Sequence, residues 1–131
     1  MIEYWKLIRL FYLGLLTILL IGCNGVDPGA ARAVENYYKA LIAADYNQLI
    51  NSSCAAWESQ AKLDYDSFAA VEAELDNLSC HETGKQGDYT LVDCTGVIMA
   101  NYGNEVLEIN LSHQTYLTIY EGDEWRMCGY R

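Results

Sequence analysis

The 131-residue chain is poor in proline and in basic residues, and its longest apolar run is short for a transmembrane helix. Its only proline is Pro28, and eight Lys and Arg face 18 Asp and Glu, a net charge of −10. Such an acidic balance argues against binding nucleic acid or an anionic lipid surface. The uncharged stretch from Leu10 to Gly22 falls short of the roughly 20 residues that a transmembrane helix needs.

Several signatures of catalysis and metal binding are also missing. The sequence has no C-x-x-C pair, no Ser-His-Asp order with a nucleophile elbow and no glycine-rich phosphate loop; Gly84 and Gly87 are predicted turn glycines. The two histidines, His81 and His113, do not have zinc-site spacing to the cysteines. We therefore expect neither a metal nor a cofactor.

The first 23 residues have the features of an export signal. Lys6 and Arg9 precede a short apolar stretch that ends in small residues, as in secretory signal peptides. The sequence Leu20-Ile21-Gly22-Cys23 resembles the lipobox of bacterial lipoproteins. This resemblance implies cleavage after Gly22 and lipidation of the Cys23 sulfur. The alternative is an uncleaved anchor helix with a chance cysteine.

This interpretation divides the chain into a signal peptide (1–22), a lipidated N-terminus with a short tether (23–30) and one domain (31–131). Without the signal peptide, 17 acidic and six basic side chains remain, a net charge near −11. Several acyl chains on Cys23 would attach the protein stably to a membrane. We expect an exported protein, anchored in the cell membrane or outer membrane and facing the periplasm or exterior.

The first half of the domain is predicted to be helical. Apolar residues at helical spacing predict a helix over about 30–43, and Asp45 begins a second, short helix with Leu49 facing inward. A third helix is predicted over 64–78, with Asp66 as N-cap. Its apolar stripe would consist of Phe68, Val71, Leu75 and Leu78.

The second half is predicted to form strands over 80–82, 89–100, 106–120 and 124–130. Residues 106–120 alternate with period two, which predicts one strand with one buried face. That face would carry Leu107, Ile109, Leu111, His113, Thr115, Leu117 and Ile119. Helices followed by an antiparallel meander predict an α+β fold with the helices on one sheet face.

This order, with "AVENYYKALIAADYNQL" at the front and "GDEWRMCGYR" at the end, resembles the nuclear transport factor 2-like superfamily. The resemblance implies a curved sheet wrapped around helices into a cone. Members include lipoproteins without known activity and enzymes such as ketosteroid isomerases and polyketide cyclases, so the fold does not decide the function. It also implies that an exposed sheet face, here with Tyr116 and Tyr120, could hold a homodimer together.

Four cysteines besides Cys23 predict two disulfides in an exported domain. In the expected meander, Cys94 and Cys128 flank one strand from either side, about 10 Å apart. A disulfide needs Cα atoms within about 7 Å. A turn near Gly87 places Cys80 opposite Cys94, so we predict the pairs Cys80–Cys94 and Cys54–Cys128.

Two residues are candidates for chemistry. We expect His113 and Asp93 on the apolar side of their strands, facing the cone cavity, where an acid and a base could serve an isomerase or cyclase. Against this stands a non-enzymatic domain that binds a small apolar ligand or an envelope protein. A purely structural envelope protein is the third hypothesis.

Overall fold

The structure, a computed structural model, describes residues 29–131. The predicted signal peptide and Cys23 lie outside the described residues. The elements are α2 (Gly29–Ile42), α3 (Tyr46–Asn51), the 3-10 helix η1 (Ala55–Trp57), α4 (Glu58–Phe68), β1 (Glu72–Gln86), β2 (Tyr89–Asn101), β3 (Val106–Asn110), the 3-10 helix η2 (Leu111–His113), β4 (Thr115–Glu121) and β5 (Glu124–Tyr130).

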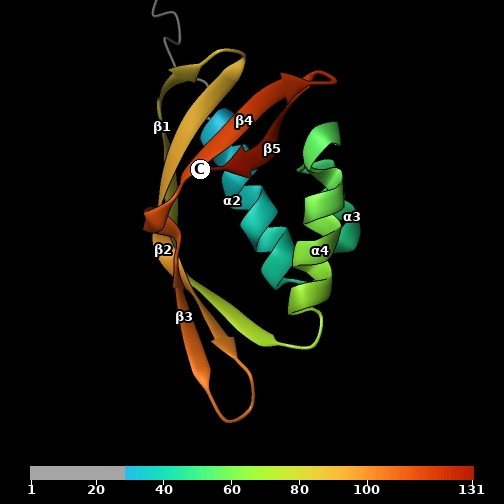
Figure 1. Cartoon of the computed structure of the whole chain (residues 1–131), viewed down its shortest axis with the longest axis vertical. Helices are drawn as coiled ribbons and strands as arrows, with labels where there is room; N and C mark the ends of the chain where they lie inside the picture. Colours follow the sequence, from blue (N-terminus) through green and yellow to red (C-terminus); the bar gives the residue numbers. More distant parts are fainter. Residues whose placement is uncertain (1–28) are drawn as a thin grey trace, which may run out of the picture.

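The arrangement is α+β, as predicted: helices come first and pack on one side of an open antiparallel sheet (Figure 1). α2 is the central helix and contacts β1, β2, β4 and β5. Its buried face includes Val34, Tyr37, Tyr38 and Leu41. Asp45 caps α3 by accepting a hydrogen bond from the Gln48 backbone N–H at 3.0 Å, which confirms the predicted start of this helix.

The predicted third helix over 64–78 is wrong. α4 begins at Glu58 and ends at Phe68, so Asp66 lies in its last turn and does not cap its start. From Glu72 the chain forms β1, in which exposed and half-buried residues alternate. The helix-like spacing of apolar residues was overridden by pairing with β2, a contact distant in sequence that propensity does not register.

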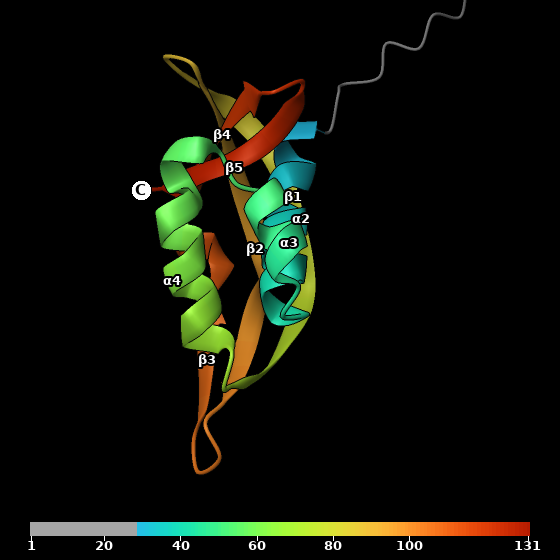
Figure 2. The ribbon, with the colours of Figure 1, turned by 90° about the vertical axis from the view of Figure 1, so that its right-hand side faces the viewer.

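The sheet has the strand order β1-β2-β4-β5, and β3 pairs with β2 beyond the end of β4 (Figure 2). The predicted single strand over 106–120 is therefore also wrong, because η2 divides it into β3 and β4. The Asn110 side chain accepts hydrogen bonds from the backbone N–H of Ser112 at 2.9 Å and from its hydroxyl at 2.7 Å, which stabilises the turn.

The interruption at η2 changes which face is buried. In β4 the fully buried residues are Tyr116 and Thr118, and Leu117 and Ile119 are only half-buried. Tyr116 was expected on the exposed face of this strand, and that expectation is wrong. Tyr116 faces the helices, and its hydroxyl donates to the Leu111 carbonyl at 2.9 Å.

Two disulfides connect these elements, and they are the pairs that the sequence predicts. Cys80 and Cys94 are direct partners in the β1–β2 register, with Cα atoms 4.1 Å apart. Cys54 and Cys128, 74 residues apart in sequence, join the segment before η1 to β5. Near this second bond, the backbone N–H of Cys54 donates to the Met127 carbonyl at 2.8 Å. The helical layer is thus fastened to the last strand both covalently and by hydrogen bonds.

Candidate binding cleft

A cleft of about 420 Å³ lies between α4 on one side and β3 and η2 on the other. Its apolar residues come from α2, α4, η2 and the strands, and two carboxylates and one histidine stand among them. Figures 1 and 2 show α4 on the far side of α2 from β1. The lining residues are Tyr38, Leu41, Asp64, Phe68, Ile98, Glu108, Ile109, Asn110, Leu111, His113, Gln114 and Tyr130.

A chain of aromatic rings runs behind the cleft. Tyr38 contacts Tyr37 and Tyr116 edge-on, with ring centroids 5.5 and 5.6 Å apart. Tyr130 contacts Tyr116 at 6.4 Å and Trp57 at 5.6 Å, again edge-on. Because such edge contacts fix the rings relative to one another, the aromatic wall of the cleft is preorganised.

Asp64, a carboxylate of the cleft lining, accepts two hydrogen bonds. The Tyr37 hydroxyl donates to Asp64 Oδ2 at 2.5 Å, and Gln60 Nε2 donates to Oδ1 at 3.0 Å. Burial of the ring, and then the neighbouring Asp64, raise the pKa of Tyr37 far above its usual range. Tyr37 is therefore a fixed neutral donor that orients Asp64 at the cleft.

Tyr38 and Tyr116 are also kept neutral. Burial is the main cause that raises the pKa of each, and for Tyr38 the neighbouring Tyr116 adds to the rise. Neither hydroxyl is thereby suited to act as a base near neutral pH. The tyrosines of this wall contribute shape and hydrogen bonding.

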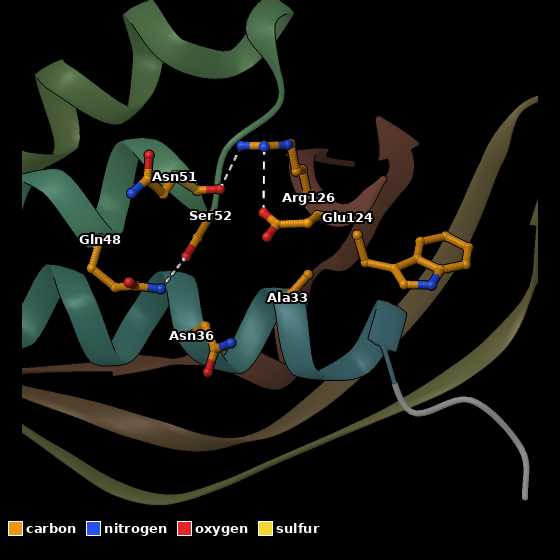
Figure 3. A pocket seen from close by; sticks show the side chains of 8 residues that line it. Ala33, Asn36, Gln48, Asn51, Ser52, Glu124 and Arg126 are labelled. Carbon is orange, nitrogen blue, oxygen red and sulfur yellow. Dashed lines mark hydrogen bonds and ion pairs between the residues drawn. The ribbon is translucent and has the colours of Figure 1, made fainter. Parts of the chain in front are cut away.

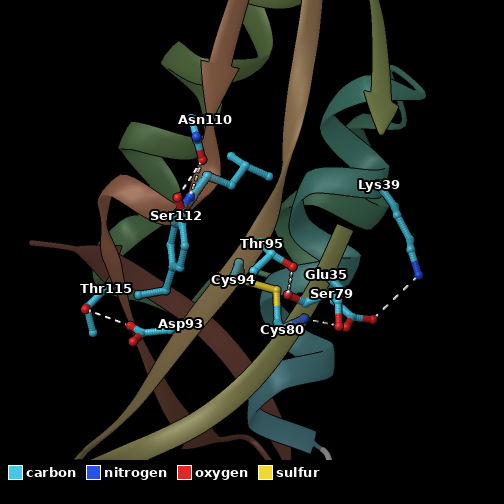
Figure 4. The surroundings of a disulfide bond; sticks show 12 residues. Glu35, Lys39, Ser79, Cys80, Asp93, Cys94, Thr95, Asn110, Ser112 and Thr115 are labelled. Carbon is cyan, nitrogen blue, oxygen red and sulfur yellow. Dashed lines mark hydrogen bonds and ion pairs between the residues drawn. A yellow bond between two sulfur atoms is a disulfide. The ribbon is translucent and has the colours of Figure 1, made fainter. Parts of the chain in front are cut away.

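The expected pairing of His113 with Asp93 inside a cavity is wrong. His113 ends η2, is exposed and lines the cleft, but Asp93 is absent from the cleft lining. In β2 Asp93 stands between the buried residues Val92 and Cys94, which puts it on the opposite face of the sheet. There Asp93 Oδ1 accepts a hydrogen bond from the Thr115 hydroxyl at 2.8 Å (Figure 4). The acid–base pair of the enzyme hypothesis is not assembled.

Figure 4 also shows how α2 is fixed to β1 beside the Cys80–Cys94 bond. The Glu35 carboxylate accepts a hydrogen bond from the Cys80 backbone N–H at 3.1 Å, and it lies 3.7 Å from the Lys39 ammonium. Glu35 is thus occupied in holding the helix to the strand. Exposed His81, the other histidine, lies across from Asp93 in the β1–β2 register, away from the cleft.

A second hollow, of about 460 Å³, lies between α2, α3 and β5 (Figure 3). Its polar groups already bind one another: Arg126 Nη1 donates to the Asn51 carbonyl at 2.6 Å, and Gln48 Nε2 donates to the Ser52 hydroxyl at 3.3 Å. Arg126 also lies 3.4 Å from the Glu124 carboxylate. The bond from Arg126 to Asn51 joins β5 to α3, which is a structural role, so the cleft beside α4 is the stronger binding candidate.

Sequence reasoning missed Asp64, Phe68 and Glu108 as cleft residues. Asp64 and Phe68 are one helical turn apart on α4, a spacing that puts them on one face. The misplaced third helix hid this signal, because it made Asp64 a helix start and gave Phe68 to a different apolar stripe. Between Gly29 and Arg131 no group of three metal-binding side chains converges, and no helix there is long and apolar enough to cross a bilayer.

Comparison with known proteins informs the fold only. No family model matches the chain, and no curated protein matches it in sequence. Its structure is similar to the solution structure of a SEC-C motif-containing protein from Rhodopseudomonas palustris, with a TM-score of 0.54 and 10% sequence identity over 79% of each chain. At this identity the similarity supports the α+β arrangement and carries no function across.

Proposed function

We propose that this protein is a non-enzymatic binding domain of the bacterial cell envelope, anchored by lipid on Cys23, with a nuclear transport factor 2-like fold. Its ligand occupies the cleft between α4 and β3. The observation that carries this proposal is the cleft itself, in which seven apolar or aromatic side chains stand beside five polar ones. Binding sites for small ligands combine apolar and aromatic side chains with polar groups that fix the orientation of the ligand.

The compartment is supported by the disulfides. Two disulfides in a domain of this size are typical of proteins outside the reducing cytoplasm. The lipid anchor rests on the lipobox resemblance at Leu20–Cys23. An anchored domain with a net charge near −11 would remain in the aqueous layer beside an anionic membrane and not adhere to it.

Binding in the cleft is testable with a neutral apolar dye, Nile red. We expect its fluorescence to rise on titration with the domain, and Phe68→Ser to weaken binding about tenfold, because that side chain lines the cleft. Leu63→Ser is the matched control, since Leu63 is also on α4 but 59% exposed and outside the cleft. Equal dye binding by wild type and both variants would contradict the cleft as the site.

The anchor is tested separately. Cys23→Ser, expressed in a bacterium that processes lipoproteins, should no longer incorporate labelled palmitate and should leave the detergent phase on partitioning. The domain should keep its wild-type melting temperature, because the two disulfides do not involve Cys23. Unchanged palmitate incorporation in this variant would remove the lipid anchor from the proposal.

A further inference from the structure

Beside β3 the sheet has a vacant strand position. On one edge of β2, β4 pairs with residues 90–93 and β3 pairs with residues 97–101. The other edge of β4 is covered by β5, but among residues 29–131 β3 pairs with β2 alone. β5 ends at Tyr130, and the backbone of Arg131 bonds to that of Thr115 at the first residue of β4. β5 therefore covers the edge of β4 that faces away from β2, but no strand in the described part of the chain covers the corresponding edge of β3.

The cleft runs along this open edge. Three consecutive residues of β3, Glu108, Ile109 and Asn110, line it. Successive side chains of a strand point to opposite faces, so a cleft that reaches all three extends from the helix-facing side of β3 around its open edge. Every second residue of an edge strand directs its N–H and C=O away from its partner strand. On β3 these groups point to the side away from β2, which no strand among residues 29–131 covers.

The surroundings favour an extended chain with apolar and basic residues. Ile109 and Leu107 lie on the helix-facing side of β3, as does Ile98 across from Ile109 on β2, and Phe68 of α4 stands opposite. Leu107 is 45% exposed, so the apolar strip continues past the cleft toward the hairpin tip. Among the described residues, the cleft lining contains two acidic residues, Asp64 and Glu108, and no Lys or Arg.

We propose that the occupant of the cleft is an extended peptide segment of a partner protein, which adds to β3 as an antiparallel strand. This inference rests on the proposed binding function and specifies its ligand class. Apolar side chains of the segment would enter between β3 and α4, and its Lys or Arg side chains, which point to the other face of the sheet, would meet Glu108. The backbone would supply affinity and the cleft would supply the choice of side chains.

The test uses a synthetic acetylated heptapeptide of alternating Lys and Val. When the peptide is added to the domain, it should protect alternate backbone amides of β3 from hydrogen exchange, as measured by NMR. Two N-methylated versions, one methylated at the odd residues and one at the even residues, test pairing directly. Only every second peptide N–H faces β3, so one version should lose binding at least tenfold and the other should bind like the parent. Equal binding by the two versions would overturn the inference.

Neighbouring residues of β3 supply the matched variants. Leu107→Ser should weaken peptide binding about fivefold, whereas Val106→Ser should leave it within twofold, because Val106 is 57% exposed on the opposite face of the same strand. Equal loss in both variants would contradict an occupant on the helix-facing side. Self-association that Leu107→Ser abolishes would name a second copy of this chain as the occupant, and would overturn the proposed partner.

The dye separates this inference from the function on which it rests. If Nile red binds in a Phe68-dependent manner and the peptide leaves the β3 amides unprotected, the cleft stands as a small-ligand site and the peptide inference is wrong. If neither dye nor peptide binds, both proposals are wrong.

Discussion

Gly96 of β2 lies so close to the backbone of Asn77 in β1 that a Cβ on the glycine would stand 2.9 Å from the Asn77 carbonyl oxygen. Both residues have positive φ, +116° for Gly96 and 54° for Asn77. The β1–β2 register shifts at this point, between Asp76 and Ser79. This bulge lies where β2 changes its partner from β4 to β3, since Val97 is the first residue that pairs with β3.

Gly96→Ala should therefore destabilise the domain by about 3 kcal/mol, because the new methyl group meets backbone atoms at a positive φ. A thermal melt should show a midpoint lower by about 10 °C or more. Gly84→Ala is the control, since a Cβ there would have no atom within 4 Å. Equal stability of the two variants would contradict the role assigned to Gly96.

The two disulfides should differ in their contribution to stability. The chain-entropy estimate gives about 4.5 kcal/mol for the loop closed by Cys54–Cys128 and about 3 kcal/mol for that closed by Cys80–Cys94. Paired Cys→Ala substitutions, measured by urea unfolding, should show the larger loss for the first bond. The reverse order would mean that local packing around Cys80 and Cys94 outweighs loop length.

Stability should fall at alkaline pH. Tyrosines of the unfolded chain lose their protons near pH 10, but burial raises the pKa of Tyr37, Tyr38 and Tyr116 in the native state. Above pH 10 the native state thus binds more protons than the unfolded state, and each such tyrosine lowers the free energy of unfolding by up to about 1.4 kcal/mol per pH unit. Below pH 10 the contribution is constant.

Urea unfolding at pH 9, 10 and 11 measures this slope. Tyr38→Phe should make the free energy of unfolding fall less steeply with pH, because one buried tyrosine no longer contributes to the slope. Tyr102→Phe, at a position 53% exposed on the β2–β3 turn, should leave the slope as it is in the wild type. Identical slopes for all three proteins would show that buried tyrosines do not govern the alkaline limit.

Asp93 should prove to be a structural residue. Asp93→Ala removes a half-buried hydrogen bond to the Thr115 hydroxyl, which typically contributes about 1 kcal/mol. Nile red binding should be unchanged, because Asp93 does not line the cleft. A double-mutant cycle with Thr115→Val checks the pair, and a large loss of dye binding in Asp93→Ala would return Asp93 to the site.

The sequence predicted what depends on local pattern and failed where distant pairing decides. The helix over 30–43 and the Asp45 cap follow from spacing and capping chemistry, and both are confirmed. Residues 72–78 have helix-like apolar spacing, but β2 recruits them as a strand. The predicted strand register was not correct residue by residue, but it still predicted which cysteines pair. The order of the strands alone decides which cysteines are close enough for a disulfide.

The candidate site was less accessible to such reasoning. The strict alternation of residues 106–120 concealed η2, where the Asn110 side chain turns the chain and reverses which residues of β4 are buried. That single turn moved Tyr116 to the helix side and created the open edge of β3. The cleft therefore depends on an interruption that periodicity cannot register.

α2 begins at the end of the molecule opposite the β2–β3 hairpin, as both views show (Figures 1 and 2). Only five residues lie between Cys23 and Gly29, a reach of about 20 Å when extended. With Cys23 lipidated, the hairpin would point away from the bilayer while the protein diffuses in two dimensions. A partner would then meet the β3 edge on the membrane-distal end of the domain, where proteins that pass through the surrounding aqueous layer can reach it.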